Sequence, residues 1–445
     1  MKKWCSLQER TFRFLEKKLR KDHKGWTYKD VSDPRQAGKV TIPMSDILWS
    51  LELGLISNQP TLRDVEALTQ ELAGWTRRLV PAAISDTTLD TEVRRLDVDA
   101  LRKKLHERVR DFYRRKMLSP VGLPCGIVTI DGKNLATLKH DAAGTGHARS
   151  SANEKWHPKP TQEAKLGKGY YLMPAIRAVL TSAEAKVCID QLALPPQTGE
   201  STSFGRMVED LHQAYGRSGM FEVIDGDAGL TSLANADAID RLGYAYIFGL
   251  KGNQAELFAE AQTLLEAQAE REAPEAETPW ERRNGITIRR RLWRTREMAG
   301  FENSVGRWDH LRQVWLVRQE TKHRDGHIAV EDRIFITSLL WNYLSPSQIL
   351  LTVRNHWGIE NDANNTMDLQ WREDSGPWCT QGTAVWALGI LRQMAYNTVQ
   401  ILRRRRLRKK RSDGSRAAPM SWRSIFKLIE DVLRHDIDAV MVPAG

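Results

Sequence analysis

Five strand-like segments in the middle of the chain restrict its fold more than any other feature. They read GIVTID (126–131), YYLMPAIRAVL (170–180), KVCIDQLAL (186–194), MFEVIDGD (220–227) and YAYIFGL (244–250). Helix-like segments, SFGRMVEDLHQAY and LANADAIDRLG, separate the last three of them. Three strands followed by alternating helix and strand predict an α/β fold with a mixed sheet flanked by helices.

The segments on either side of this region have different patterns. Residues 1–120 read as helices, and TLRDVEALTQELAG with ISDTTLDTEVRRL has the size of a helix-turn-helix, although two ordinary packed helices give the same pattern. Basic residues crowd positions 102–116 and favour phosphate contacts there. We therefore expect a helical N-terminal DNA-binding domain over 1–120 and a catalytic domain over 121–402.

Two further segments are expected beyond the central strands. Within 280–340, the stretches GITIRRRLW, RQVWLVRQE and HIAVEDRIFITSLL indicate hairpins, and so a β-rich insertion in the domain. Residues 403–445 contain the run RRRRLRKKR and an amphipathic segment, SWRSIFKLIEDVLRH, which predict a basic C-terminal segment and a helix.

The charge balance of the whole sequence favours a polyanionic partner. Lys and Arg number 67 against 56 Asp and Glu, a net charge of +11 over 445 residues. Nucleic acid is the first expectation, and an anionic membrane surface is the second. No run of about 18 apolar residues occurs, so we expect no membrane span and a cytoplasmic protein. The four cysteines, Cys5, Cys125, Cys188 and Cys379, form no CxxC pair and are expected to be reduced, structural thiols.

A glutamate occupies an unusual position in the helix predicted from Ser345 onward. Ser345, Pro346 and Gln348 form the pattern of a capping box with proline in the first turn. Stepping about 100° per residue from there puts Glu360 inside the apolar stripe of this helix. A buried carboxylate is satisfied either by a partner such as His356 or by a metal ion.

Two aspartates follow strand-like segments and are candidates for the same site. Asp131 ends the first such segment and Asp227 ends the fourth, and acids at strand ends are where α/β proteins place their chemistry. An Asp before Gly is also ordinary turn chemistry. Asp225, two residues earlier on the same strand face, is the alternative to Asp227. With Glu360 these acids make an oxygen-only site suited to Mg²⁺ or Mn²⁺, with two ions expected.

Together these stretches resemble a known family. VTIDGKNL, VIDGDAG, AIDRLGYAYIFGLKGNQAEL and RNHWGIENDANNTMDLQWRED are similar to the motifs of bacterial insertion-sequence DDE transposases, in the ISAs-type branch of the IS-four-like superfamily. The likeness covers roughly residues 120–400. It implies an RNase H-like catalytic core, Asp131, Asp227 and Glu360 as the catalytic and metal-binding triad, and a homodimer on double-stranded DNA.

The resemblance also suggests DNA contacts outside the triad. Lys133, Lys251, Arg354 and His356 lie in the matching motifs. Lys251 and the nearby Asn253 and Gln254 can contact phosphate or support the sheet edge, and His356 can hydrogen-bond Glu360 or a phosphate.

The basic stretches add a few more candidate contacts. In RRNGITIRRRLWRTR, Trp293 and Arg290 can hold an unpaired base and a phosphate, or Trp293 can belong to the core behind a solvated strand face. The run at 403–411 is either a solvated tail or, as we expect, a DNA-binding segment.

The expected function is therefore DNA transposition. Such an enzyme would hydrolyse the phosphodiester at each terminal inverted repeat with a metal-activated water and then direct the freed 3′-hydroxyl onto target DNA. A stand-alone RNase H-like nuclease is the alternative enzyme. A catalytically inactive transposase retained as a DNA-binding protein is the alternative without catalysis.

Overall fold

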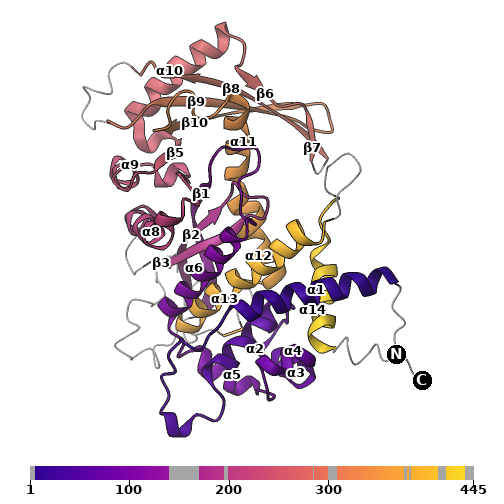
Figure 1. The fold of residues 1–445 in the computed structure, drawn as a ribbon. Helices are drawn as coiled ribbons and strands as arrows, with labels where there is room; N and C mark the ends of the chain where they lie inside the picture. The colour runs from indigo at the N-terminus through magenta and orange to yellow at the C-terminus, as the bar shows by residue number, and fades with distance from the viewer. Residues whose placement is uncertain are drawn as a thin grey trace.

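The computed structural model describes residues 6–139, 170–194, 199–283, 285–298, 308–374, 378–379, 382–408 and 417–435. In these residues one large mixed sheet has the strand order β3-β2-β1-β4-β5-β10-β9-β8-β6, with β7 paired to β8 (Figure 1). The first five strands are β1 (Ile127–Lys139), β2 (Tyr170–Leu180), β3 (Val187–Ala193), β4 (Val223–Gly226) and β5 (Ala245–Leu250). All five overlap the strand-like segments of the sequence, although β1 continues to Lys139, beyond the predicted end at Asp131, and β4 is shorter than predicted.

The central strands are partly antiparallel and partly parallel. β1, β2 and β3 are antiparallel neighbours, whereas β4 runs parallel to both β1 and β5. The parallel strands need crossovers, which α8 (Glu200–Tyr215) and α9 (Leu233–Asp240) help to provide. The predicted mixed α/β architecture is confirmed.

The expected β-rich insertion does not form a sheet of its own. Its strands are β6 (Ala276–Glu277), β7 (Glu281–Arg283), β8 (Ile286–Thr295), β9 (Gln313–Lys322) and β10 (Ile328–Thr337). The predicted hairpins are present, since β8, β9 and β10 are antiparallel neighbours. β10 also pairs with β5, in the register of Ile334 with Leu250, so these strands extend the central sheet.

Helices cover both faces of the sheet. Figure 1 shows α8 and α9 on one side and α11 (Pro346–His356) on the other. The alternation of side chains along β4 explains this arrangement. Val223 packs in a cluster with Ile349 and Val353 of α11, whereas the next residue, Ile224, packs in a separate cluster that includes residues of α8 and α9. Two opposite apolar faces therefore hold the short central strands in place.

The N-terminal part of the described chain is helical, as predicted. It contains α1 (Ser6–Gly25), α2 (Met44–Ile56), α3 (Leu62–Glu71), α4 (Gly74–Leu79), α5 (Asp86–Val93) and α6 (Val98–Arg114). These helices share one hydrophobic cluster with α13 (Gly382–Ile401) and α14 (Trp422–Arg434). At the end of α14, Leu433 O accepts hydrogen bonds from the Thr76 hydroxyl and the Ala73 amide. The N- and C-terminal helices thus pack into one core.

The basic residues around α6 are mostly engaged inside the protein, contrary to the expected phosphate contacts. Arg102 bonds both oxygens of the buried Asp190 on β3, and Arg108 pairs with the buried Glu52 of α2. Lys104, also buried, pairs with Asp30 and Glu107. These side chains join helices to each other and to the sheet, because burying a cation requires a charged partner.

The described part of the C-terminal basic run is also paired internally, which corrects the solvated-tail and DNA-binding interpretations for residues 403–408. Arg404 pairs with Asp362, Arg406 with the buried Asp22, and both Arg405 and Arg408 with Glu184. Arg403 donates to Met420 O. Positions 409–411 lie outside the described residues.

The cysteines and the possibility of a membrane span were also considered from the sequence. Cys125, Cys188 and Cys379 are buried free thiols, as predicted, and Cys5 lies outside the described residues. No helix in the described part of the chain is both long enough and apolar enough to cross a membrane.

Candidate active site

The parallel pairing of β1 with β4 places two of the predicted acids side by side. Thr129 pairs with Asp225 and Ile130 with Gly226, and the next residues along the two strands are Asp131 and Asp227. Asp131 lies within β1 where its parallel pairing with β4 ends, and Asp227 directly follows β4, so both lie at the carboxyl end of that parallel pairing. The side chain of Asp131 accepts a hydrogen bond of 2.8 Å from the Gly132 amide.

Asp227 also has the turn role that was considered for it. Its Oδ1 accepts a 3.2 Å hydrogen bond from the Leu230 amide and so caps the short helix η4 (Ala228–Leu230). Its side chain is nevertheless exposed, so one carboxylate oxygen can face solvent while the other caps the turn. The two interpretations of this residue are compatible.

Glu360 reaches the same end of the sheet, but not from a buried helix position. Helix α11 begins with the predicted capping box at Ser345 and ends at His356, and Glu360 lies in the π-helical segment η6 (Ile359–Asn364). A wider turn changes the angle per residue, so stepping by 100° beyond His356 gives the wrong face. Glu360 is exposed, and the expectation that it is buried was wrong.

The pKa of Asp131 reflects the other acids around it. Burial raises the pKa of Asp131 to about 7, with further contributions from the negative charges of Asp227, Glu360 and Glu200. Like charges disfavour ionisation of a carboxyl group in their midst. Asp131 of β1, Asp227 just after β4, Glu200 of α8 and Glu360 of η6 therefore form one negative cluster. Glu200 was not identified from the sequence.

The donor set of this cluster is made of carboxylates, which suits Mg²⁺ or Mn²⁺. In the described residues, however, no group of three or more His, Cys, Asp or Glu side chains is arranged to hold a metal ion as it stands. Asp227 and Glu360 are exposed, so rotation of their side chains costs little packing.

Asp225 lies beneath the cluster and is held by two partners. It is 2% exposed, and its Oδ2 accepts hydrogen bonds from the Thr129 hydroxyl at 2.9 Å and from His356 Nδ1 at 2.8 Å. Its Oδ1 is buried without a hydrogen-bond partner among the described residues. His356 therefore bonds Asp225, not Glu360 or a solvent-facing phosphate as had been considered.

The K-x-N-Q run supports the turn that follows Asp227. The Asn253 side-chain amide donates to Ala228 O at 2.8 Å, and that of Gln254 donates to Thr231 O at 3.1 Å. This is the structural alternative considered for Asn253 and Gln254. Lys251 directly follows β5 and is exposed. Its role as a DNA contact stays a prediction.

Two other predicted DNA contacts are engaged in ion pairs. Lys133, with only 11% of its side chain exposed, pairs with Asp368 of α12 (Asn365–Trp371). Arg354 is exposed, but it pairs with Glu281 of β7 at 2.9 Å. Lys133 thus anchors α12 to β1, and Arg354 connects α11 to the edge of the extended sheet.

The predicted contacts from the β-rich region belong to the protein interior. Trp293 is 3% exposed and its indole nitrogen donates to Glu272 O at 3.0 Å, so the core alternative holds and base stacking is not available to it. Arg290 is 8% exposed. Both expectations of DNA contact are corrected. Trp293 packs in one core cluster with Leu257 and Leu265 of α10 (Ala255–Arg271), and Arg290, which has the opposite parity on β8, is buried on the other face of the strand.

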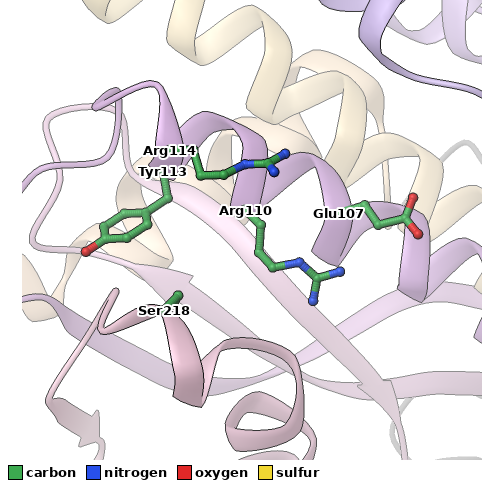
Figure 2. Close-up of a pocket in the computed structure, with 5 residues that line it drawn as sticks. All are labelled: Glu107, Arg110, Tyr113, Arg114 and Ser218. Atoms are coloured by element: carbon green, nitrogen blue, oxygen red, sulfur yellow. The ribbon is translucent and has the colours of Figure 1, made fainter.

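A hollow on the outer face of α6 is separate from the acids. Figure 2 shows its lining residues Glu107, Arg110, Tyr113, Arg114 and Ser218, around a volume of about 470 Å³. Two of them are already used internally, since Arg110 donates to Ala214 O and the Tyr113 hydroxyl to Gly219 O. None of the four clustered acids lines this hollow.

Comparison with known proteins identifies the family. Residues 126–398, more than half of the chain, match the family described as "Transposase DDE domain". The chain belongs to the DDE transposase family. The stretch shared with this transposase family begins just before β1 and ends in α13, so it includes all four clustered acids and the strands β6–β10.

One curated relative is similar to part of the chain. It is an uncharacterized protein in the dhlA 3′ region of Xanthobacter autotrophicus, 26% identical over 157 residues. The similarity covers 35% of this chain and 50% of that protein. The chain thus matches about half the length of this relative.

Proposed function

We propose that this protein is a transposase of the ISAs-type insertion-sequence branch that cuts DNA at terminal inverted repeats and joins the ends to a target. The observation that carries the proposal is the side-by-side position of Asp131 and Asp227 where the parallel pairing of β1 and β4 ends, within a region that matches the DDE transposase domain. The order of three antiparallel strands followed by parallel β4 and β5 supports an RNase H-like core for it.

The proposed catalytic and metal-binding residues are Asp131, Asp227 and Glu360. Two Mg²⁺ or Mn²⁺ ions held between these carboxylates would activate the attacking oxygen and neutralise charge on the phosphodiester. Asp131 lies in the sheet and its position is fixed by β1. The exposed side chains of Asp227 and Glu360 would rotate toward it when a metal ion binds. The raised pKa of Asp131 supports this role, since clustered negative charge attracts a cation.

The surrounding residues position these acids. Asp225 and His356 join β4 to the end of α11, four residues before Glu360, and so restrict where η6 can lie. Asn253 and Gln254 hold the turn after Asp227. The orphaned Oδ1 of Asp225 adds a further negative group beneath the site and fits a neighbouring cation better than a neutral ligand.

The proposed partner is double-stranded DNA, bound as a homodimer so that both element ends are processed together. The net charge of +11 and the exposed Lys251, which directly follows β5, support DNA as the partner. The salt dependence of binding to a duplex carrying the element end measures this contribution.

Cleavage and joining of a short duplex carrying the element end, with Mg²⁺ or Mn²⁺, test the function. We expect the wild type to nick the end and join it to target, and Asp227→Asn and Glu360→Gln to bind the same duplex without cutting it. Cutting without strand joining would identify a nuclease instead. Binding without cutting by the wild type would identify a catalytically inactive DNA-binding protein.

A further inference from the structure

Glu200 occupies space beside β1 that only a glycine leaves open. A Cβ atom added to Gly132 would lie 1.9 Å from Oε1 and 2.1 Å from Cδ of Glu200. Any side chain at position 132 would therefore displace this carboxylate. Gly132 directly follows Asp131, so the missing side chain lets a fourth acid lie beside this part of β1.

The first turn of α8 is also fixed relative to the other acids. Asn235 donates one hydrogen bond to the Ser201 hydroxyl at 3.2 Å and one to Leu230 O at 2.7 Å. Leu230 closes the turn that Asp227 caps. One side chain thus connects the residue next to Glu200 with the turn next to Asp227, so the two acids keep their relative position.

Alternation along β1 shows from which side Glu200 approaches. Thr129 bonds Asp225 and Lys133 pairs with Asp368, so these residues and Asp131 between them point to the α11 side of the sheet. Gly132 has the opposite parity and faces α8. Glu200 therefore reaches the cluster from the face opposite Glu360, at a point where β1 extends beyond its pairing with β4.

We propose that Glu200 is a fourth carboxylate of the metal site, acting on the bound cation from the α8 side of β1. This inference rests on the proposed function, because it assigns Glu200 to the same site. Hard divalent cations take six or more oxygen ligands, so three carboxylates leave positions for a fourth or for water that it orients.

Binding of Mn²⁺ to the full-length protein, measured by isothermal titration calorimetry, tests the inference without reference to catalysis. We expect Glu200→Gln to weaken Mn²⁺ affinity on the order of tenfold. The matched control is Glu209→Gln, an exposed acid on the same helix, which should leave affinity unchanged. Equal Mn²⁺ affinity for these two variants would overturn the assignment.

Gly132→Ala provides a second, independent variant that keeps all four acids. The added methyl must push the Glu200 carboxylate away from its place beside β1. We expect Mn²⁺ affinity to fall about as far as in Glu200→Gln. The double variant should lose nothing more, since both changes remove the same ligand. If Gly132→Ala bound Mn²⁺ with wild-type affinity, the proposal that Glu200 reaches the metal from beside Gly132 would be wrong.

Asp227→Asn separates the two proposals. If it retains both Mn²⁺ affinity and DNA cutting, the proposed function itself fails. If it loses both while Glu200→Gln binds Mn²⁺ as the wild type does, the proposed function stands and only the role of Glu200 is rejected.

Discussion

His356 Nδ1 lies 2.8 Å from Asp225 Oδ2, and this buried pair joins the last turn of α11 to the central strand β4. Burial lowers the pKa of His356, but the attraction of Asp225 and of the more distant Asp131 and Asp227 outweighs it, so the net shift is upward. Asp225 therefore favours the protonated form of His356.

This pair should make stability depend on pH. A histidine whose folded pKa is raised stabilises the fold fully below its unfolded pKa of about 6.5, and the stabilisation is lost as pH rises through the folded pKa. We expect His356→Gln to cost about 2 kcal/mol at pH 5.5 and clearly less at pH 8.5. Urea unfolding at the two pH values measures this. The exposed His323→Gln serves as control, and an equal loss at both pH values for His356→Gln would refute the prediction.

Asp131 should destabilise the protein when divalent metal is removed at neutral pH. Its folded pKa of about 7 lies above the ordinary value. Ionisation of Asp131 therefore lowers the free energy of unfolding progressively as pH rises from about 4 to 7. In EDTA, Asp131→Asn should therefore raise the free energy of unfolding at pH 7.5 by about 1–3 kcal/mol and change little at pH 4. Thermal melts across this range would count against the idea if the variant were less stable throughout.

Trp293 should contribute to folding, not to binding unpaired bases. Because its indole is buried and hydrogen-bonded to Glu272 O, Trp293→Ala should lower the free energy of unfolding by about 3–5 kcal/mol. Trp280, which is 40% exposed and lies beside Arg289, gives the matched control with a loss below about 1 kcal/mol. Denaturant titration measures the free energy of unfolding of both variants. If Trp293→Ala had normal stability but bound single-stranded DNA more weakly, Trp293 would have the stacking role instead.

A buried charge cluster next to α13 should respond unequally to two substitutions. Arg177 bonds both oxygens of Glu373, and both residues are 0% exposed, whereas the nitrogens of Arg392, 1% exposed, have no hydrogen-bond partner in the described chain. Glu373→Gln should cost about 3–5 kcal/mol, because it leaves two uncompensated guanidinium groups. Arg392→Met should cost nothing or stabilise the fold. Equilibrium unfolding of both variants measures this, and a large loss in Arg392→Met would indicate an additional partner for that arginine.

Local patterns accounted for much of the fold. The strands from Ile127 to Leu250 and the start of α11 at Ser345 were predictable, because alternation and capping involve residues close together in the chain. The acids at 131 and 227 were identifiable for the same reason. Charge patterns predicted less well, since Arg290 and Arg406 look like DNA contacts but are paired or buried inside the protein.

By itself, the sequence determined the α/β class, the limits of most strands and helices, and the candidate acids Asp131, Asp227 and Glu360. Only the tertiary structure decided that β10 joins β5, that His356 bonds Asp225, and that Glu360 emerges from a π-helical turn exposed to solvent. It also decided that Glu200 enters beside Gly132. The reason is that periodicity and capping act within a few residues, whereas pairing, burial and helix phase depend on contacts between residues far apart in the chain.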